Sequence, residues 1–80
     1  MSVDERLRQV FADVFGIGGD AVVDEDSPST IDGWDSVTHL NLVLALEGEF
    51  MVQFEAEEIP ELTTYRVIRE RVAAAERTPG

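Results

Sequence analysis

The start of the chain has the periodicity of an amphipathic helix. Ser2-Val3-Asp4-Glu5 fits a capping box, in which the serine and the glutamate satisfy backbone N–H groups of a first helical turn. Apolar residues then recur on one helical face, at Leu7, Val10, Phe11, Val14 and Phe15. Gly16 follows them and suits a left-handed C-terminal cap. The pattern predicts a helix over about residues 3–15.

A second helix is predicted for about residues 36–50, and its apolar positions form two faces. Asp35 or Ser36 supplies the N-cap, because both residue types accept hydrogen bonds from first-turn N–H groups. At about 100° per residue, one face contains Leu42, Val43, Leu46 and Phe50, and a displaced second face contains Val37, Leu40 and Leu44. Either the helix is buried between its neighbours, or the second face meets a partner or a bound apolar chain.

The remaining segments complete an all-α fold in a single domain, residues 1–80. The loop 16–35 is rich in Asp, Ser, Pro and Gly, and Val22, Val23 and Ile31 are its expected contacts with the core. A short helix is predicted at about 55–59, ended by Pro60. A last helix is predicted at about 64–76, capped by Thr63 or Thr64. We therefore predict a small bundle of three main helices and one short helix, with a long loop between the first two.

The net charge and the positions of the basic residues indicate which kinds of molecule the protein can bind. The chain has 80 residues, a net charge of -11 and six basic residues, all arginine. No Lys or Arg occurs between Gln9 and Tyr65, so the middle of the chain carries a negative field. Such a field repels nucleic acids and anionic membranes and favours proteins with basic patches. The charge alternatively serves only to keep a small domain in solution.

The composition also bears on location and metals. No apolar run reaches the ~20 residues of a membrane span, and the start is charged where a signal peptide is apolar, so we expect a cytoplasmic protein. Cysteine is absent, which excludes disulfides and thiolate ligands. Asp24 and Asp26 resemble the first ligands of a calcium loop, but Pro28 and Ser29 break that pattern. We expect no metal site.

The candidate chemistry lies in the stretch IDGWDSVTHL, where Asp35, Ser36 and His39 are close in sequence. A hydrolase site is disfavoured, because no Gly-x-Ser-x-Gly elbow and no oxyanion hole can be identified. As an attachment point Ser36 is better suited, because the positive end of a helix dipole favours a phosphodiester on its oxygen. For an isolated Asp-Ser pair, a capping role alone is the default interpretation.

The order of motifs resembles the acyl carrier protein family, the phosphopantetheine-binding carrier domains. The likeness rests on Gly33-Trp34-Asp35-Ser36-Val37 opening an apolar helix, then on LVLALEGEF, and then on EEIPELTTYRVI. It covers nearly the whole chain. The Asp-Ser pair alone is a weak signal, but this surrounding order makes the signal strong.

The resemblance implies a carrier without catalytic activity of its own. Ser36 would bear a 4'-phosphopantetheine arm, taken from coenzyme A by a separate phosphopantetheinyl transferase, and Asp35 would help that enzyme and its metal ion engage. Acyl groups would be held on the arm as thioesters. The surface for partner enzymes, which commonly present basic docking patches, would include Val37, Leu40, Leu44, Glu47 and Glu49.

Departures from the family pattern bear on the pathway. Fatty acid carriers tend to have acids along the first turns of this helix, whereas this chain has Thr38, His39 and Asn41. Val37 replaces a commoner leucine, and Trp34 adds a bulky ring. These changes favour polyketide or nonribosomal peptide biosynthesis over fatty acid biosynthesis. The exclusive use of arginine suggests a GC-rich bacterial genome.

Two alternatives to the acyl carrier remain open. One is a peptidyl carrier of a nonribosomal peptide synthetase, which would hold an aminoacyl or peptidyl group. The other is an unmodified helical module that binds a partner through the second apolar face. Because Met1 and Gly80 lie close to the predicted first and last helices, we expect a free-standing carrier, and an excised domain of a larger synthase would look the same. We also expect a monomer.

Overall fold

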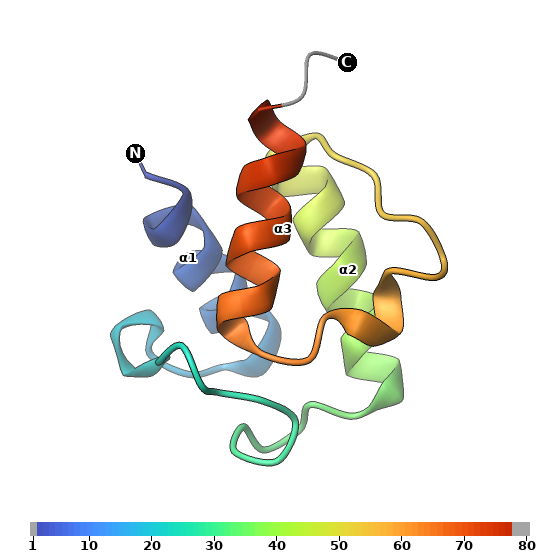
Figure 1. Cartoon of the computed structure of the whole chain (residues 1–80). Helices are drawn as coiled ribbons and strands as arrows, with labels where there is room; N and C mark the ends of the chain where they lie inside the picture. Colours follow the sequence, from blue (N-terminus) through green and yellow to red (C-terminus); the bar gives the residue numbers. More distant parts are fainter. Residues whose placement is uncertain (1, 78–80) are drawn as a thin grey trace.

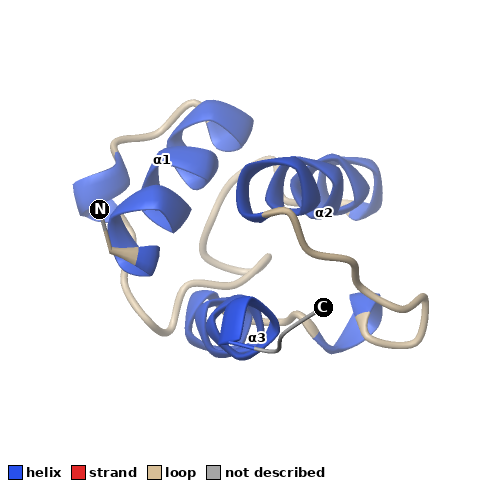
Figure 2. Cartoon of the chain, turned by 90° about the horizontal axis from the view of Figure 1, so that it is seen from above, coloured by secondary structure: helices blue, strands red, loops and turns tan. Residues whose placement is uncertain are grey.

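The computed structural model describes residues 2–77 and contains helices but no strand in that range. Its elements, in chain order, are α1 (Val3–Phe15), the 3-10 helix η1 (Gly19–Ala21), α2 (Ser36–Phe50), the 3-10 helix η2 (Ile59–Glu61) and α3 (Tyr65–Arg77). The three α-helices surround a common core, with the loop after α1 crossing one end of the bundle (Figures 1 and 2). The predicted all-α bundle is confirmed.

The ends of α1 follow the predicted capping chemistry. The Glu5 backbone N–H donates to the Ser2 hydroxyl oxygen at 3.2 Å. Gly16 has a φ of 68° and donates its N–H to the Ala12 carbonyl at 2.8 Å, which is a left-handed cap. Because both ends are satisfied locally, α1 begins and ends where the sequence predicts.

One core joins all three helices and the long loop. Phe11 of α1 is fully buried, and its ring packs edge-on against Trp34 at 5.6 Å and against Tyr65 at 5.1 Å between ring centroids. Such edge contacts add to the stabilisation from burial alone. The buried apolar side chains are Leu7, Val10, Phe11, Val22, Ile31, Trp34, Leu42, Val43, Leu46, Phe50, Leu62, Tyr65, Ile68 and Val72.

The long loop contacts the core through two of the three predicted residues. Val22 and Ile31 are buried, but Val23 is 52% exposed, so the prediction for Val23 is wrong. Val23 opens a turn in which its backbone N–H donates to the Asp26 carboxylate, and consecutive residues of an extended chain face opposite ways. With Val22 directed inward, Val23 faces solvent.

The start of α3 takes its hydrogen-bond partners from this loop. The N–H groups of Tyr65 and Arg66 donate to the carbonyls of Asp26 and Asp24 at 2.9 and 3.1 Å. The Thr64 hydroxyl accepts from the Val67 N–H at 3.2 Å, as expected for a capping threonine. Long-range acceptors and a local cap therefore satisfy the first turn together.

Hydrogen bonds and ion pairs in a charged cluster around Tyr65 connect α1, the loop and α3. The Tyr65 hydroxyl donates to the Asp4 carboxylate at 2.7 Å, and Arg8 donates to the same carboxylate at 2.8 Å. Arg69 binds the Asp24 carboxylate with two nitrogens, at 2.6 and 3.1 Å. Arg8 and Arg69 also lie over the Tyr65 ring. Hydrogen bonds from Tyr65 and then Arg8 lower the pKa of Asp4.

The short helix predicted for 55–59 is wrong in its position. The structure instead has turns followed by η2, and Pro60 lies inside η2 rather than after it. Proline is tolerated there because first-turn N–H groups have no intrahelical acceptor to lose. Arg71 of α3 holds this segment by donating to Glu58 at 3.3 Å and to Glu61 at 2.9 Å.

Candidate functional site

The start of α2 is organised by Asp35. Its backbone is extended, its side-chain oxygen accepts from the Thr38 N–H at 2.9 Å, and its carbonyl accepts from the His39 N–H at 2.8 Å. Asp35 is therefore the N-cap. The hydrogen bond from the Thr38 backbone lowers the pKa of the Asp35 carboxyl, so the group is anionic at neutral pH.

Ser36 is the first residue of α2 and is exposed. Because Asp35 takes the capping role, the Ser36 hydroxyl is not needed to satisfy the helix end, and within residues 2–77 it makes no hydrogen bond. The first turn of α2 contains no acidic residue. A hydroxyl at this position can carry an anionic substituent at the positive end of the helix dipole.

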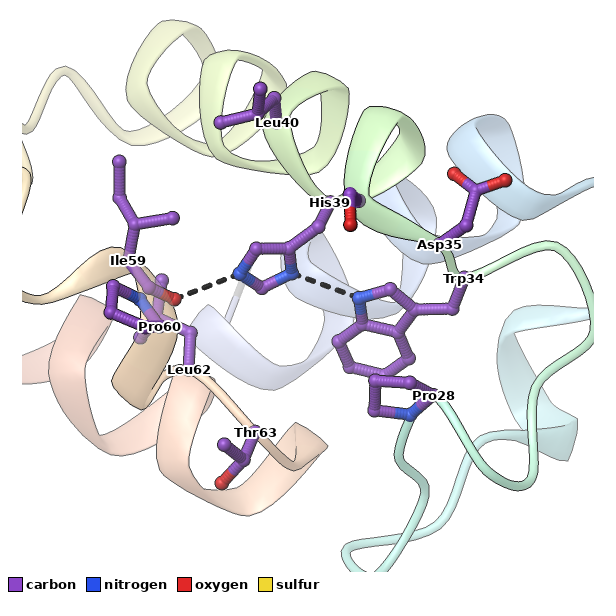
Figure 3. A pocket seen from close by; sticks show the side chains of 10 residues that line it. Pro28, Trp34, Asp35, His39, Leu40, Ile59, Pro60, Leu62 and Thr63 are labelled. Atoms are coloured by element: carbon purple, nitrogen blue, oxygen red, sulfur yellow. Dashed lines mark hydrogen bonds between the residues drawn. The ribbon is translucent and has the colours of Figure 1, made fainter.

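His39 is bonded on both sides of its ring, and neither partner is Ser36. The Trp34 indole N–H donates to His39 Nδ1 at 2.9 Å, and His39 Nε2 lies 2.8 Å from the Ile59 carbonyl (Figure 3). Because an indole nitrogen only donates, Nδ1 must accept, and the ring proton is on Nε2, where it donates to Ile59. His39 therefore bridges α2 to η2 and offers no base to the Ser36 hydroxyl.

An open pocket of about 540 Å³ lies beside this bridge, between the start of α2 and the segment leading into α3. Trp34 and His39 lie side by side in it, with ring planes 21° apart, and the Asp35 carboxylate points away from His39 (Figure 3). The lining residues, most of them apolar, are Pro28, Trp34, Asp35, Ser36, His39, Leu40, Ile59, Pro60, Leu62 and Thr63. The pocket therefore offers an apolar surface directly beside the Ser36 hydroxyl.

The second apolar stripe of α2, Val37, Leu40 and Leu44, faces solvent and is called here the exposed face of α2. Their exposed fractions are 69%, 53% and 66%. Burial between neighbouring helices, the alternative explanation for this stripe, is therefore wrong. Exposed apolar side chains grouped on one helix are typical of an interaction surface.

Glu47 and Glu49 make contacts within the protein. The Glu47 carboxylate accepts from the Phe54 N–H at 2.9 Å, which fixes the chain after α2. The Glu49 carboxylate pairs with Arg6 of α1 at 3.1 Å. Their role in partner recognition stays a prediction, and the exposed face of α2 itself is apolar rather than acidic.

Sequence reasoning missed the Trp34–His39–Ile59 bridge and the pocket that it borders. Ile59 lies 20 residues after His39, so the sequence pattern does not assign its carbonyl as a partner of the imidazole. No family model matches the chain. Over the described range, no set of three or more His, Asp or Glu side chains is placed to hold a metal ion. In the same range, every helix is too short or too polar to cross a bilayer.

Proposed function

We propose that the protein is a carrier domain in which Ser36 bears a 4'-phosphopantetheine arm. The observation that carries the proposal is the exposed Ser36 hydroxyl at the first position of α2, which makes no hydrogen bond in the described part of the chain. The motif order around Asp35 and Ser36 is similar to that of acyl carrier proteins, and this resemblance is the reason for proposing 4'-phosphopantetheine as the substituent. The role of Ser36 is that of an attachment point, and the chemistry is supplied by a transferase.

The residues at this site fit a phosphodiester. Its negative charge on the Ser36 oxygen would lie at the positive end of α2, where the neighbouring carboxylate is that of the cap Asp35 and the first turn itself contains no acid. The anionic Asp35 carboxylate is exposed next to the attachment point, where an oxygen ligand suits the Mg²⁺ ion of a transferase. When bound, the arm supplies a terminal thiol that holds acyl groups as thioesters.

The pocket and the exposed face of α2 have separate roles in this proposal. The apolar pocket beside Ser36 gives the arm and its cargo a surface to lie against, lined by side chains such as Leu40, Ile59 and Pro60. The exposed face of α2 contacts partner enzymes. The absence of acids from the first turn of α2 favours a polyketide-type carrier, with a nonribosomal peptidyl carrier as the second candidate.

Intact-protein mass spectrometry tests the proposal. The protein is incubated with coenzyme A, Mg²⁺ and a phosphopantetheinyl transferase of broad specificity, and the product is mapped by peptide analysis. We expect a gain of one phosphopantetheine unit on Ser36 and none for Ser36→Ala. Circular dichroism of Ser36→Ala checks that the variant is folded, because an exposed side chain outside the cap contributes little to stability.

A well-folded protein that gains no mass would overturn the carrier proposal. The exposed apolar face of α2 would then favour the other candidate, an unmodified module that docks on a partner protein. Labelling at a residue other than Ser36 would contradict the site while keeping the class of function.

A further inference from the structure

The two hydrogen bonds of the His39 ring require it to be neutral. Nδ1 accepts from the Trp34 indole N–H at 2.9 Å, and Nε2 donates to the Ile59 carbonyl at 2.8 Å (Figure 3). A protonated imidazole carries an N–H on both nitrogens and accepts at neither. Protonation of His39 would therefore place Nδ1–H against the indole N–H, donor against donor.

Trp34 is fixed in the core, so the imidazole is the ring that has to move. The indole is 4% exposed and packs against Phe11 and Phe15, with 5.6 and 5.3 Å between ring centroids. His39 is only partly buried and lines the open pocket. A ring that turns away from Trp34 also leaves the position from which Nε2 reaches Ile59, so one proton breaks both bonds.

The charged side chains on the elements around His39 are turned away from it or already paired. Among the described residues that line the pocket, Asp35 is the one other titratable group, and its carboxylate points away from the imidazole (Figure 3). Around η2, Glu58 and Glu61 accept from Arg71 at 3.3 and 2.9 Å. A protonated ring is therefore favoured in solvent, where the net charge of -11 attracts it, rather than in the bridge.

We propose that His39 is a pH-sensitive switch between α2 and η2, closed when the ring is neutral and open when it is protonated. An ordinary histidine takes up its proton at about pH 6.5, and the closed form has no place for that proton. Below about pH 6.5, each further pH unit should therefore raise the ratio of open to closed molecules about tenfold. The bridge stabilises the protein above this pH, and its contribution is lost as the pH falls.

This inference goes beyond the carrier function, because the switch needs no group on Ser36. Ile59 and Pro60 of η2 form one wall of the pocket beside Ser36. In the open form this wall is no longer bound to α2 through His39. Any group on the Ser36 oxygen would therefore meet a different surface in acid than at neutral pH.

NMR of the unmodified protein tests the switch. The chain contains one histidine and one tryptophan, so one imidazole and one indole N–H signal report on the bridge. Leu62 reports on η2, because its amide N–H donates to the same Ile59 carbonyl at 3.2 Å. The signals are followed from about pH 7.5 to about pH 5, above the range in which ordinary carboxyl groups take up protons.

His39→Gln is the matched variant, because glutamine offers a donor and an acceptor but does not titrate. In the wild type we expect the indole signal to shift together with the imidazole signals. We expect the Leu62 amide of the wild type to exchange with solvent about ten times faster than that of His39→Gln at about pH 5, the effect of one pH unit of opening. The two proteins should match at about pH 7.5.

Trp34→Phe separates the switch from a general effect of charge on the ring. Phenylalanine has no N–H to oppose a proton on Nδ1, so the protonated imidazole can stay bound to the Ile59 carbonyl. We expect His39 to titrate in this variant while the Leu62 exchange follows that of His39→Gln at every pH. Circular dichroism checks that both variants are folded.

Three results would overturn the proposal. One is an indole signal that stays unchanged in the wild type while the imidazole takes up its proton, and this measurement needs no variant. Another is equal Leu62 exchange in the wild type and His39→Gln at about pH 5. The third is a release of η2 in acid that persists in Trp34→Phe. None of them depends on whether Ser36 accepts phosphopantetheine, so the switch and the carrier function are tested separately.

Discussion

The two apolar faces of α2 contain the same kinds of side chain in opposite surroundings. Leu42 and Leu46 on one face are fully buried, whereas Leu40 and Leu44 on the other are more than half exposed. The first face belongs to the buried core, whereas in the described part of the chain no residue of the second face belongs to that core or packs against it. The two faces together make α2 apolar nearly all round, which a helix at the surface of a small domain does not need for folding.

This difference separates residues that hold the fold from residues available for function. The buried face belongs to a core that also includes the rings of Phe11, Trp34 and Tyr65. The exposed face adjoins Ser36 and the pocket and makes no comparable contact. Apolar character alone therefore does not identify core residues in this chain, and the relevant measurement is what each side chain contributes to the free energy of unfolding.

A matched pair of leucine truncations gives the largest expected contrast. Leu46→Ala should lower the free energy of unfolding by about 2–5 kcal/mol, because it leaves a cavity in a closely packed core. Leu44→Ala, the same chemical change on the exposed face, should lower it by less than about 0.5 kcal/mol. Urea unfolding followed by circular dichroism measures both. Comparable losses from the two variants would show that Leu44 belongs to the core.

The Trp34–His39–Ile59 bridge, which joins α2 to η2, gives the second prediction. His39→Phe keeps an aromatic ring but leaves the Trp34 indole N–H and the Ile59 carbonyl without their partner. Trp34 is only 4% exposed, so water has little access to its N–H. We expect a loss of about 2 kcal/mol, the typical effect of leaving a buried polar group unsatisfied. Thermal and urea unfolding measure it.

The tautomer of His39 gives an independent check on the same bridge. At neutral pH, ¹⁵N NMR of the imidazole should show the proton on Nε2 and a bare Nδ1. Observation of the Nδ1–H tautomer would contradict the bond from Trp34 and remove the reason for the loss expected in His39→Phe. Trp34→Phe serves as a partner variant, because it releases Nδ1 while keeping the Ile59 contact.

A third prediction concerns the polar edge of the core. Tyr65→Phe removes the hydroxyl that donates to Asp4 at 2.7 Å and keeps the ring that packs on Phe11. Because the acceptor is ionised, we expect a loss of about 1.5 kcal/mol. Chemical denaturation measures it. The same loss in an Asp4→Asn background would show that the hydroxyl stabilises the protein through some other contact.

Local patterns predicted most of the fold. The capping box, Gly16 and the two stripes of α2 are properties of neighbouring residues, and the observed bounds of the three α-helices lie within one residue of those predicted. The short helix predicted at about 55–59 is the exception, because the sequence does not show whether Pro60 ends a helix or lies in the first turn of one, as it does in η2. Val23 was assigned to the core because composition alone does not indicate which of two adjacent valines faces inward.

The candidate site around Ser36 was also predictable only in part. The order of Asp35 and Ser36 predicts a capped helix with a hydroxyl at its start, and the structure places Asp35 as the cap. The pocket was not predictable, because it depends on a contact between His39 and Ile59, which are 20 residues apart. The engagement of Glu49 by Arg6 depends in the same way on the packing of α1 against α2.

The smallest expected effect is the loss of stability in acid that comes from the ion pair between Asp24 and Arg69. A hydrogen bond from Arg69 lowers the pKa of Asp24 in the folded protein. A carboxyl with a lowered folded pKa stabilises the protein above its unfolded pKa, about 4, and this stabilisation is lost as pH falls through the folded value. Asp24→Asn should therefore melt a few degrees below the wild type at pH 7, as expected for a partly exposed ion pair, and the difference should close as the pH falls through the lowered pKa of the folded protein.

Asp32→Asn is the matched control for this experiment. Asp32 is exposed, and across residues 2–77 it forms no ion pair, so its replacement changes the net charge equally without removing a partner. Equal melting temperatures for Asp24→Asn and Asp32→Asn at every pH would assign the effect to the shared change in the net charge of -11 rather than to Arg69. A gap that closes in acid would instead confirm that this side of the molecule is held by specific charge pairs, in contrast to the uncharged exposed face of α2.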